Sequence, residues 1–355
     1  MKTYTTDGKV VHFSKEEQLN DKLIRLIGGK FGEYRAKWDK ASSFDLVTDF
    51  PIFLQLDMNQ ECNFSCPHCI VGEKSVADRY YNGDPLSWEK FKSIVDEGQE
   101  HNCPSISLQG NNEPLLIKDL EKYIKYAENH GFIDIMINSN ASAMTEKKAK
   151  SMLDSGLTRI RFSIDAADEI AFNKIRIGGR YNQVIKNIER FLDLKEKGGY
   201  KLPITGVSFC RQRDNEHQVE DFINQWKDKV DMVTIQKYMP PVPEPGYDKF
   251  YPSDQEDSSD ILLNGFKCPQ PFQRVTVRNS DITPCCAAMS SKLKLGEVGK
   301  QSIYDSWNSK SMMELRELHS KGEWYKNPVC KACVEMSDPQ AKNLKVVKNL
   351  KVATI

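Results

Sequence analysis

Apolar residues recur along the chain in short runs that are separated by longer stretches of mixed character. The runs lie at 52–57, 105–109, 133–138, 158–164, 204–209 and 232–237. Each run has the length and the composition of a buried β-strand. Strands that alternate with helices in this way predict a parallel sheet with crossover helices, and therefore an α/β fold.

Several of the intervening stretches have the periodicity of a helix with one buried face. Their apolar positions repeat at 91–95, 152–153, 184–192 and 219–226. Ser87 and Thr145 stand shortly before two of these stretches, and both residue types favour the N-cap position. We therefore expect helices to begin directly after these two residues.

The chain before the first apolar run is polar and mixed. Leu19, Leu23 and Ile27 fall on one helical face, and we expect Gly28 to end that helix. A second short helix is expected near residues 34–38. We interpret this region as a cap that packs on the first strand.

Composition and charge narrow the range of functions. The chain has 50 basic and 50 acidic residues, so nothing in its charge favours a nucleic-acid partner. No apolar run is long enough to span a membrane and no apolar signal region stands at the start, so we expect a cytoplasmic protein without a membrane partner. Its 10 cysteines then indicate metal binding or catalysis rather than disulfides.

Three of these cysteines follow the first apolar run on one short loop. Cys62, Cys66 and Cys69 have the spacing C-x3-C-x2-C. Three thiolates so close together can hold three corners of an iron–sulfur cube and leave the fourth iron open to a chelating molecule. A structural zinc site would need a fourth Cys or His, and His68 lies too close in sequence to complete that tetrahedron easily. A coincidental zinc loop is the alternative.

This loop, placed after the first strand, resembles that of the radical S-adenosylmethionine (radical SAM) enzymes. The resemblance implies a partial (β/α)6 barrel and a [4Fe–4S] cluster on Cys62, Cys66 and Cys69. S-adenosyl-L-methionine (SAM) would chelate the open iron, and reduction of the cluster would yield a 5′-deoxyadenosyl radical. A flavodoxin or a ferredoxin-type protein would supply the electron. The resemblance also places Phe64 and His68 among the cofactor-binding residues.

The loop after the second strand resembles the Gly-Gly-Glu segment of that family, which meets the SAM amino group. Gly110, Asn112 and Glu113 stand at this place. Asparagines replace the second glycine, but the glutamate persists. An ordinary glycine turn is the alternative explanation. A carboxylate or a backbone carbonyl suits a cationic amine, so we carry this loop over as a SAM contact.

Polar residues at the ends of the next strands resemble the SAM-ribose contacts of the family. They are Asn138 and Asn140 after the third strand, and Ser163 and Asp165 after the fourth. Such residues also form ordinary turns and helix caps. Arg176 lies in a segment that resembles the one whose arginine meets the SAM carboxylate, a role that suits its planar guanidinium. A solvated surface arginine is the alternative.

A second group of cysteines follows a proline-rich segment at 240–246 and an acidic stretch at 252–260. Its members are Cys268, Cys285, Cys286, Cys330 and Cys333. Without context, distant thiols with a C-x2-C pair would indicate zinc. We expect a strand hairpin at 275–283 with thiols at its base, and a helix that contains Trp307, Met312, Leu315 and Leu318.

The order of these features resembles the C-terminal SPASM extension, in its shorter one-cluster twitch form. The resemblance implies an auxiliary [4Fe–4S] cluster on Cys268, Cys330 and Cys333. Either Cys285 or Cys286 would supply the fourth ligand, and we favour Cys285, which follows a proline. A full SPASM domain uses more cysteines, for two clusters.

The sequence therefore predicts a radical SAM barrel with a small C-terminal twitch/SPASM-like domain. The division that we expect is an N-terminal cap, the radical SAM core, a linker, the auxiliary cluster domain and a tail, at 1–50, 51–240, 241–266, 267–336 and 337–355. The tail repeats a basic and apolar pattern at 343–352, to which we assign no function.

The leading functional interpretation is a radical SAM oxidoreductase that acts on a small polar substrate. One-cluster members of the family include an aminocyclitol dehydrogenase, and the N-terminal region is short for a peptide-binding domain. We therefore expect oxidation of a sugar, a polyol or an aminocyclitol, with the auxiliary cluster as electron acceptor.

Three alternatives stay open. The first is a peptide-modifying maturase, because it would share all of these motifs. The second is a radical epimerase, in which Cys210 at the end of the fifth strand returns a hydrogen atom; a buried core thiol is the other explanation of this cysteine. The third is a zinc or iron sensor without enzymatic activity.

Overall fold

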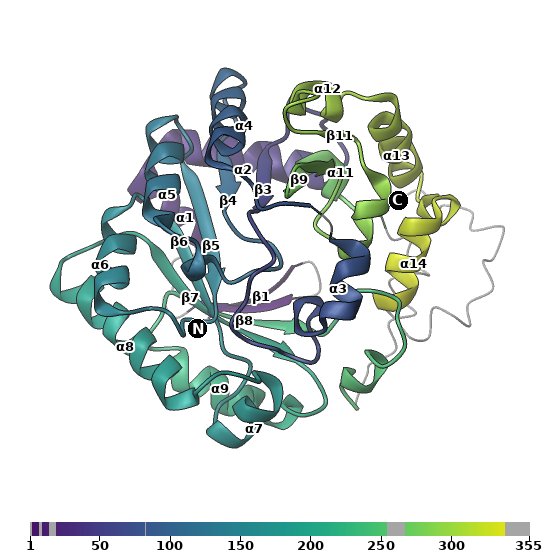
Figure 1. Ribbon diagram of the computed structural model, residues 1–355. Helices are drawn as coiled ribbons and strands as arrows, with labels where there is room; N and C mark the ends of the chain where they lie inside the picture. Colours follow the sequence, from purple (N-terminus) through teal and green to yellow (C-terminus); the bar gives the residue numbers. More distant parts are fainter. Residues whose placement is uncertain (1, 7–8, 14–18, 82, 254–266, 338–355) are drawn as a thin grey trace.

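The computed structural model describes residues 2–6, 9–13, 19–81, 83–253 and 267–337, with the backbone alone for residues 2–6 and 9–13. The strands form one curved sheet, and most of the helices lie around its outer side (Figure 1). The strands are β1 (Lys2–Thr6), β2 (Lys9–Phe13), β3 (Phe53–Asp57), β4 (Ser105–Ser107), β5 (Asp134–Ser139), β6 (Arg159–Ser163), β7 (Ile204–Arg211), β8 (Met232–Lys237), β9 (Arg274–Arg278), β10 (Asp281–Thr283) and β11 (Gly296–Glu297).

The helices of the first half of the chain are α1 (Leu19–Ile27), α2 (Gly29–Ser42), α3 (Lys74–Tyr80), α4 (Trp88–Glu100), α5 (Leu120–Asn129), α6 (Glu146–Asp154) and α7 (Glu169–Ile175). Those of the second half are α8 (Tyr181–Lys197), α9 (Val219–Trp226), α11 (Gln270–Gln273), α12 (Ile303–Trp307), α13 (Lys310–Ser320) and α14 (Pro328–Ser337). Ser87 and Thr145 cap α4 and α6 through their side chains, as the sequence predicts.

The centre of the sheet is parallel, which confirms the predicted α/β fold. The strand order is β1-β2-β8-β7-β6-β5-β4-β3-β9-β10-β11. All the neighbouring pairs from β8 through β3 are parallel, and each of the six predicted apolar runs coincides with most or all of one of these strands. β4 ends at Ser107 instead of residue 109, because the chain turns there into the loop that contains Gly110.

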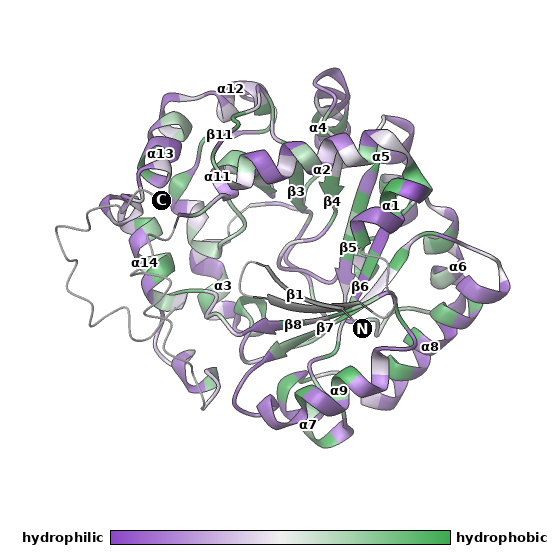
Figure 2. Ribbon diagram, turned by 180° about the vertical axis from the view of Figure 1, so that it is seen from behind, coloured by the Kyte–Doolittle hydropathy of each residue, from purple (hydrophilic) through white to green (hydrophobic). Residues whose placement is uncertain are grey.

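The strands alternate between an apolar outer face and a polar inner face. Ile106, Val233 and Val275 belong to the main core, together with buried residues of α4, α5, α8 and α9. Figure 2 shows hydrophobic and hydrophilic residues mixed along these helices, as expected of helices with one buried face. Ser107 and Thr234 neighbour such core residues in sequence, and successive side chains of a strand point to opposite faces. Buried polar side chains therefore line the inside of the barrel.

The N-terminal region contains two strands that its sequence pattern does not predict. β1 and β2 form an antiparallel hairpin, and β2 extends the sheet beside β8. The hairpin is held in the sheet by backbone pairing with a distant partner, β8, rather than by a side-chain pattern of its own. The predicted helix over 19–27 is confirmed as α1, whereas α2 is longer than predicted. The centres of the Trp38 and Phe53 rings are 6.1 Å apart in an edge-to-face arrangement, so α2 does contact the first predicted strand.

The C-terminal region continues the same sheet on the opposite edge. β9 runs parallel to β3, and β10 returns antiparallel to β9, which confirms the predicted hairpin. The single helix predicted around Trp307 and Met312 is wrong. It is divided into α12 and α13, because the Ser309 side chain accepts a hydrogen bond from the Met312 N–H and begins a new helix. Most of the acidic stretch at 252–260 and the repeat at 343–352 lie outside the described residues.

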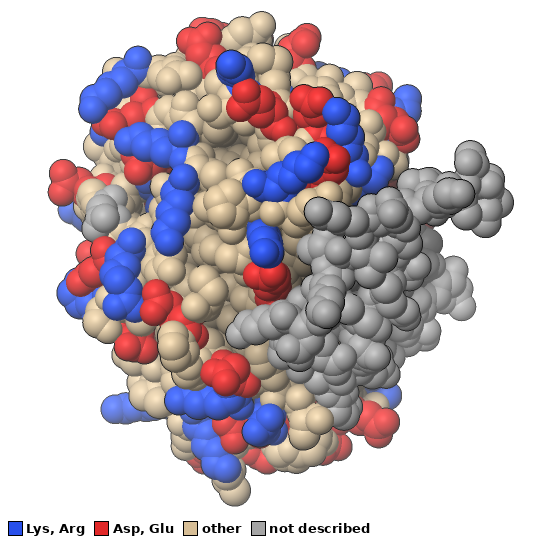
Figure 3. All heavy atoms as spheres, turned by 90° about the vertical axis from the view of Figure 1, so that its right-hand side faces the viewer, with Lys and Arg blue, Asp and Glu red and all other residues tan. Residues whose placement is uncertain are grey.

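The distribution of charge on the surface agrees with the equal numbers of basic and acidic residues. On the face shown in Figure 3, basic and acidic side chains of the described residues are interspersed rather than gathered by sign. Among the described helices, none combines the length and the apolar character that a membrane span requires.

Candidate active site

The three cysteines of the first loop open onto one cavity at the carboxyl ends of the parallel strands. The cavity has a volume of about 180 Å³, and Cys62, Cys66 and Cys69 line it together. It is also lined by eight of the ten predicted cofactor-binding residues: Phe64, Gly110, Asn112, Glu113, Asn138, Asn140, Ser163 and Arg176. His68 and Asp165 are not among the lining residues. The fold thus brings together residues that span more than a hundred positions of sequence.

Successive tight turns hold the cysteine loop in shape. The Cys69 N–H donates to the Cys66 carbonyl oxygen at 3.0 Å, and the Gly72 N–H donates to the Cys69 carbonyl oxygen at 3.0 Å. A Cβ atom at Gly72 would collide with the Cys66 carbonyl oxygen. Gly72 is therefore a site residue that the sequence analysis missed, although a glycine just after the last cysteine was a visible signal.

The loop thiols fit a multinuclear cluster. Burial raises the pKa of Cys62, Cys66 and Cys69, to about 11 for Cys69. In the part of the chain that the structure describes, no three His, Cys, Asp or Glu side chains converge closely enough to share a single metal ion. The three thiols line one cavity, and iron–sulfur clusters are held by thiolates arranged around several metal ions.

The Glu113 carboxylate ties the cavity loop to the end of β5. It is 2% exposed, and it accepts hydrogen bonds from the Ser139 hydroxyl at 2.6 Å and from the Asn140 N–H at 2.6 Å. Burial raises its pKa, and these donors oppose that rise. Glu113 therefore positions two strand-end loops, and its contact with the SAM amino group stays a prediction.

Arg176 and Asp165 form a buried ion pair beside the thiols. Their closest nitrogen and oxygen atoms are 2.6 Å apart, and another Arg176 nitrogen lies 3.8 Å from Cys66 Sγ. Burial alone would lower the pKa of Arg176, but the Asp165 carboxylate and Cys66 outweigh it and raise that pKa. Arg176 Nε is buried and has no hydrogen-bond partner among the described residues. This orphaned donor beside the cavity fits an anionic group such as the SAM carboxylate.

His68 lies behind this ion pair rather than in the cavity. Its Nε2 is 3.8 Å from the Asp165 carboxylate, and the centre of its ring lies 6.4 Å from the centre of the Tyr238 ring. Burial and the nearby Arg176 lower the pKa of His68 to about 3, so the ring is neutral. The structure therefore places His68 and Asp165 as supports of the cavity wall, and their direct contact with a cofactor stays a prediction.

A second buried ion pair connects the cavity to the C-terminal region, and the sequence analysis missed it. Asp57 ends β3 and pairs with Arg278 of β9 at 3.2 Å, with 0% and 4% of their side chains exposed. Asp57 also accepts the Asn111 N–H at 3.1 Å, while Arg278 donates to the Cys286 carbonyl oxygen at 3.3 Å. One ion pair thus joins the predicted SAM loop to the second group of cysteines.

The five cysteines of the C-terminal region lie close to one another. Burial raises the pKa of Cys285, and so do the charges of Cys286, Cys268 and Cys333. Burial and nearby thiols also raise the pKa of Cys330 and Cys333 to about 12. The donor set of closely spaced thiols fits an iron–sulfur cluster. Because Cys285 and Cys286 both lie beside the other thiols, the preference for Cys285 stays a prediction.

A tyrosine-rich cluster lies between the two groups of thiols. It contains Tyr81, Tyr238 and Tyr247, and it packs against both Val71 of the first loop and Cys333 of α14. Burial raises the pKa of Tyr81, with Cys69 and Cys286 among the charges that act on it. The two thiol groups therefore face a common region of the barrel.

Several buried polar atoms on the strands, after β7 and in the tyrosine-rich cluster have no hydrogen-bond partner among the described residues. They are Ser107 Oγ, Gln212 Oε1, Thr234 Oγ1, Tyr238 Oη, Tyr247 Oη and Thr276 Oγ1. Buried polar groups in folded proteins nearly always find a partner. These atoms are therefore available to a polar ligand or to water inside the barrel.

Cys210 lies in the same region, at the carboxyl end of β7. Its backbone N–H donates to the Asp165 carboxylate at 2.7 Å, and its side chain packs against the tyrosine-rich cluster. Burial raises the pKa of the Cys210 thiol far above its usual range, so the thiol keeps its proton. Its proposed chemical role remains a prediction.

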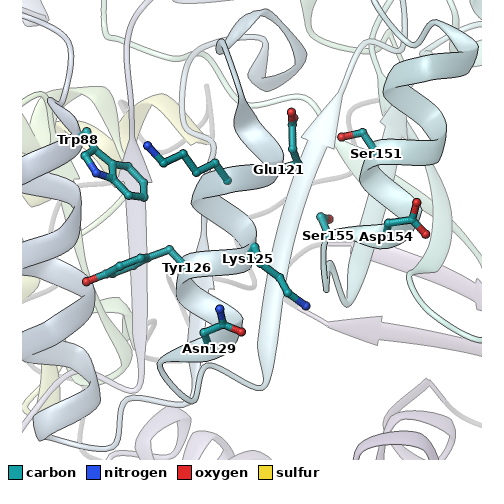
Figure 4. A pocket seen from close by; sticks show the side chains of 9 residues that line it. Trp88, Glu121, Lys125, Tyr126, Asn129, Ser151, Asp154 and Ser155 are labelled. Atoms are coloured by element: carbon teal, nitrogen blue, oxygen red, sulfur yellow. The ribbon is translucent and has the colours of Figure 1, made fainter.

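A larger hollow of about 580 Å³ lies on the outer side, where α4, α5 and α6 come together (Figure 4). Trp88 and Tyr126 form one wall, and Ser151 and Asp154 come from the opposite helix. None of the predicted site residues lines it. The chemistry predicted for this chain therefore belongs to the smaller cavity inside the barrel.

Two family models match the chain. The radical SAM superfamily matches residues 58–225, and the SPASM iron–sulfur cluster-binding domain matches residues 268–334. These segments contain both groups of cysteines, and they imply SAM, a [4Fe–4S] cluster and an auxiliary cluster as cofactors.

Curated relatives are similar over part of the chain. A probable GTP 3′,8-cyclase of Methanococcus maripaludis is 30% identical over 140 residues, which are 39% of this chain and 45% of that protein. The GTP 3′,8-cyclase of Clostridium botulinum is 28% identical over 189 residues, or 53% of this chain and 56% of that protein. The chain thus spans about half the length of the curated relatives that it matches.

Solved structures with low sequence identity share the fold. BtrN, in complex with AdoMet and 2-DOIA, has a TM-score of 0.50 and 17% identity, over 81% of this chain and 94% of BtrN. SuiB of Streptococcus suis, bound to the precursor peptide SuiA, has a TM-score of 0.59 and 14% identity, over 88% of this chain and 74% of SuiB. anSMEcpe with bound AdoMet has a TM-score of 0.59 and 16% identity, over 79% of this chain and 87% of that protein.

Proposed function

Because this chain belongs to the radical SAM superfamily and carries a C-terminal SPASM iron–sulfur cluster-binding domain, we propose that it oxidises a small polar substrate. The substrate class that we propose is a sugar, a polyol or an aminocyclitol, with the auxiliary cluster as electron acceptor. The single observation that carries the proposal is the set of unpartnered, buried polar atoms on the strands of the barrel and in the tyrosine-rich cluster.

The cofactor assignment follows from the two groups of thiols. Cys62, Cys66 and Cys69 would hold the SAM-binding cluster, and the auxiliary cluster would be held by the thiols of the second group. Arg176, with its unpartnered Nε, would bind the SAM carboxylate. When bound, the cluster and SAM together supply a radical able to remove a hydrogen atom from an unactivated C–H bond.

The inside of the barrel suits a substrate with several hydroxyl groups. Thr234 and Thr276 reach this space from opposite parts of the sheet, and Tyr238 follows β8. Each has a hydroxyl oxygen without a partner among the described residues, and a substrate hydroxyl would supply one. The surrounding tyrosine rings exclude water from the reacting carbon. Loss of one hydrogen atom, one electron and one proton would convert a secondary alcohol into a ketone.

The proximity of the two groups of thiols to one cluster of tyrosines supports the oxidative outcome. Val71 and Cys333, which pack on this cluster, belong to segments that hold different groups of thiols. A substrate among the tyrosines would therefore lie near both clusters, so its electron would have a short path to the auxiliary site. A flavodoxin or a ferredoxin-type protein would supply the first electron. We propose that the enzyme acts in the cytoplasm and that its domains have the bounds expected from the sequence.

Two other outcomes are kept as second candidates because specific observations favour them. Peptide modification is favoured by the likeness to SuiB, which was solved with a precursor peptide. Epimerisation is favoured by Cys210, because a thiol that returns hydrogen must be protonated and its pKa is raised by burial. Both would use the same barrel interior.

The test is a comparison of substrate classes with the full chain, reconstituted anaerobically with iron, sulfide and SAM. Aminocyclitols and sugars are compared with GTP and with short peptides, and 5′-deoxyadenosine and product are measured together by mass spectrometry. We expect a product whose mass is lower than that of the aminocyclitol or sugar substrate by two hydrogen atoms. One molecule of SAM should be cleaved for each molecule of product. Turnover of GTP or of peptides alone would contradict the proposal.

The matched control is the chain with Cys62, Cys66 and Cys69 all changed to Ala. The complete protein should bind about eight irons, as two [4Fe–4S] clusters require, and the variant about half of them. The variant should form no 5′-deoxyadenosine. A preparation that binds mainly zinc would contradict the cofactor assignment itself.

A further inference from the structure

One buried histidine contacts two residues of the second group of thiols at the same time. His319 lies in the last turn of α13 and is 2% exposed. Its Nε2 is 3.4 Å from Cys330 Sγ, and its Nδ1 is 3.3 Å from the backbone nitrogen of Cys268. The imidazole therefore lies between the first cysteine of the group and the C-x2-C pair on α14.

These two contacts determine where the imidazole carries its proton. A backbone N–H can only donate, so Nδ1 of His319 must accept the hydrogen bond from Cys268. A neutral imidazole with a free electron pair on Nδ1 carries its single proton on Nε2. The Nε2–H therefore points at the sulfur atom of Cys330 and donates to it.

The packing of α13 fixes the ring in this position. The buried Arg316, one turn before His319, donates to the Pro271 carbonyl oxygen at 2.9 Å, and its guanidinium lies 3.9 Å from the centre of the Trp307 ring. On the other side, the Cys330 N–H donates to the Asn327 side chain at 3.1 Å. The donor and the sulfur are therefore held by separate, well-packed segments.

Hydrogen bonds to the sulfur ligands of an iron–sulfur cluster help to set its reduction potential. Reduction adds negative charge to the cluster and its thiolates, and an N–H donor stabilises that charge. A donor on one ligand therefore favours the reduced state. An apolar side chain of similar size would fill the same space without this effect.

We propose that His319 donates an N–H···S hydrogen bond to Cys330 and thereby raises the reduction potential of the auxiliary cluster. His319 is then a positioning residue that makes this cluster a better electron acceptor. The role in turnover rests on the oxidation proposed above, whereas the effect on the potential does not, because it is measured without substrate.

The test compares His319→Leu, which removes the donor, with His319→Gln, whose side-chain amide keeps one. The reduction potentials of both clusters are measured in the reconstituted full chain by titration followed with electron paramagnetic resonance. The variant that lacks Cys62, Cys66 and Cys69 identifies the auxiliary signal. For His319→Leu we expect the ratio of reduced to oxidised auxiliary cluster at a fixed applied potential to fall at least tenfold. A tenfold fall corresponds to a decrease of about 59 mV in the reduction potential of a one-electron couple.

His319→Gln should keep most of the wild-type potential, and the SAM-binding cluster should not change in either variant. Equal shifts in both variants would mean that the histidine acts through packing alone and would overturn the proposal. An unchanged potential in His319→Leu at full iron content would overturn it as well.

A measurement on the unchanged protein covers the case in which the variants lose the cluster. Protein labelled with 15N-histidine is reduced, and the nitrogen coupling to the auxiliary cluster is read by pulsed electron paramagnetic resonance. A weak coupling is expected for a nitrogen that is bonded through hydrogen to a ligating sulfur. A strong coupling would mean that the histidine binds iron directly, and the absence of any coupling would mean that the hydrogen bond does not form; either result contradicts the proposal.

Discussion

At the scale of single residues, the site depends on close contacts that leave no room for ordinary substitutions. Gly72 lies against the Cys66 carbonyl oxygen, and Gly110 lies against the Asp57 side chain. Both glycines line the cavity with the three thiols. The cysteines supply the chemistry, but these small residues allow the backbone to bring the cysteines into one place.

Gly72→Ala should therefore prevent assembly of the first cluster. The added methyl group would collide with the Cys66 carbonyl oxygen, so the loop must move. We expect the iron content of the reconstituted chain to fall by about half, as it does when one of two [4Fe–4S] clusters is lost. Gly29→Ala is the matched control, because a Cβ atom there meets nothing within 4 Å. Full iron content in the Gly72 variant would show that the loop adapts.

Arg176→Ala should weaken SAM binding by about 1.5–3 kcal/mol, the range for a hydrogen bond to a charged group. Isothermal titration of SAM into the reconstituted chain measures this effect. Arg176→Lys keeps the charge but not the planar fork, and it should retain part of the affinity. Arg79→Ala, which changes an exposed arginine of α3, is the control. If Arg176→Ala and the control bind SAM with the same affinity, Arg176 does not contact SAM and the prediction is wrong.

At the scale of elements, β3 and β9 bring the two halves of the chain together. They pair in parallel, and Asp57 stands opposite Arg278 in the register. The two side chains form the buried ion pair that also reaches Asn111 and Cys286. The strand pairing therefore sets the position of the second group of thiols relative to the first.

Arg278→Met should destabilise the fold by about 3–5 kcal/mol, because it leaves the buried Asp57 carboxylate without its partner. Asp57→Leu should be destabilising for the same reason. The double variant should be more stable than the sum of the two changes predicts, since neither charge is then buried alone. Urea unfolding of the anaerobic, cluster-free chain measures all three variants, with Lys74→Met, at an exposed pair on α3, as the control. Additive effects would mean that the two residues do not act as a pair.

At the scale of the whole molecule, both groups of thiols face one tyrosine-rich region inside a barrel that the two ends of the chain extend. The N-terminal hairpin lengthens one edge of the sheet, and β9 to β11 lengthen the other. The site therefore lies between segments that are far apart in sequence, and Cys210 reaches it from β7. Oxidation and epimerisation would use the same space, so they differ in the fate of the substrate radical.

Turnover in D₂O should separate these two outcomes. If the substrate loses an electron, the product carries no solvent deuterium at the reacting carbon, and Cys210→Ala retains activity. If Cys210 returns hydrogen, the product gains one deuterium, because a thiol exchanges its proton with solvent. Mass spectrometry of the product, with 5′-deoxyadenosine as the measure of SAM cleavage, makes the distinction. We expect no deuterium in the product. If the wild-type product contains one solvent deuterium and Cys210→Ala forms no product, the reaction is an epimerisation instead.

The sequence by itself determined the parts of this protein that are local. The spacing of Cys62, Cys66 and Cys69 indicated a cluster loop, and the apolar runs predicted the six central strands and their order of appearance. Ser87 and Thr145 predicted two helix starts. These features could be predicted because a short stretch of chain contains both the signal and its physical cause.

The tertiary structure alone decided what depends on distant partners. The hairpin of β1 and β2 is held in the sheet by backbone pairing between β2 and β8, which no side-chain pattern reveals. Asp57 and Arg278, like His319 and Cys330, become partners only after the sheet and the C-terminal helices have formed. A buried charge or an imidazole is defined by what surrounds it, and for these residues the surroundings come from the far end of a folded chain or from another packed helix.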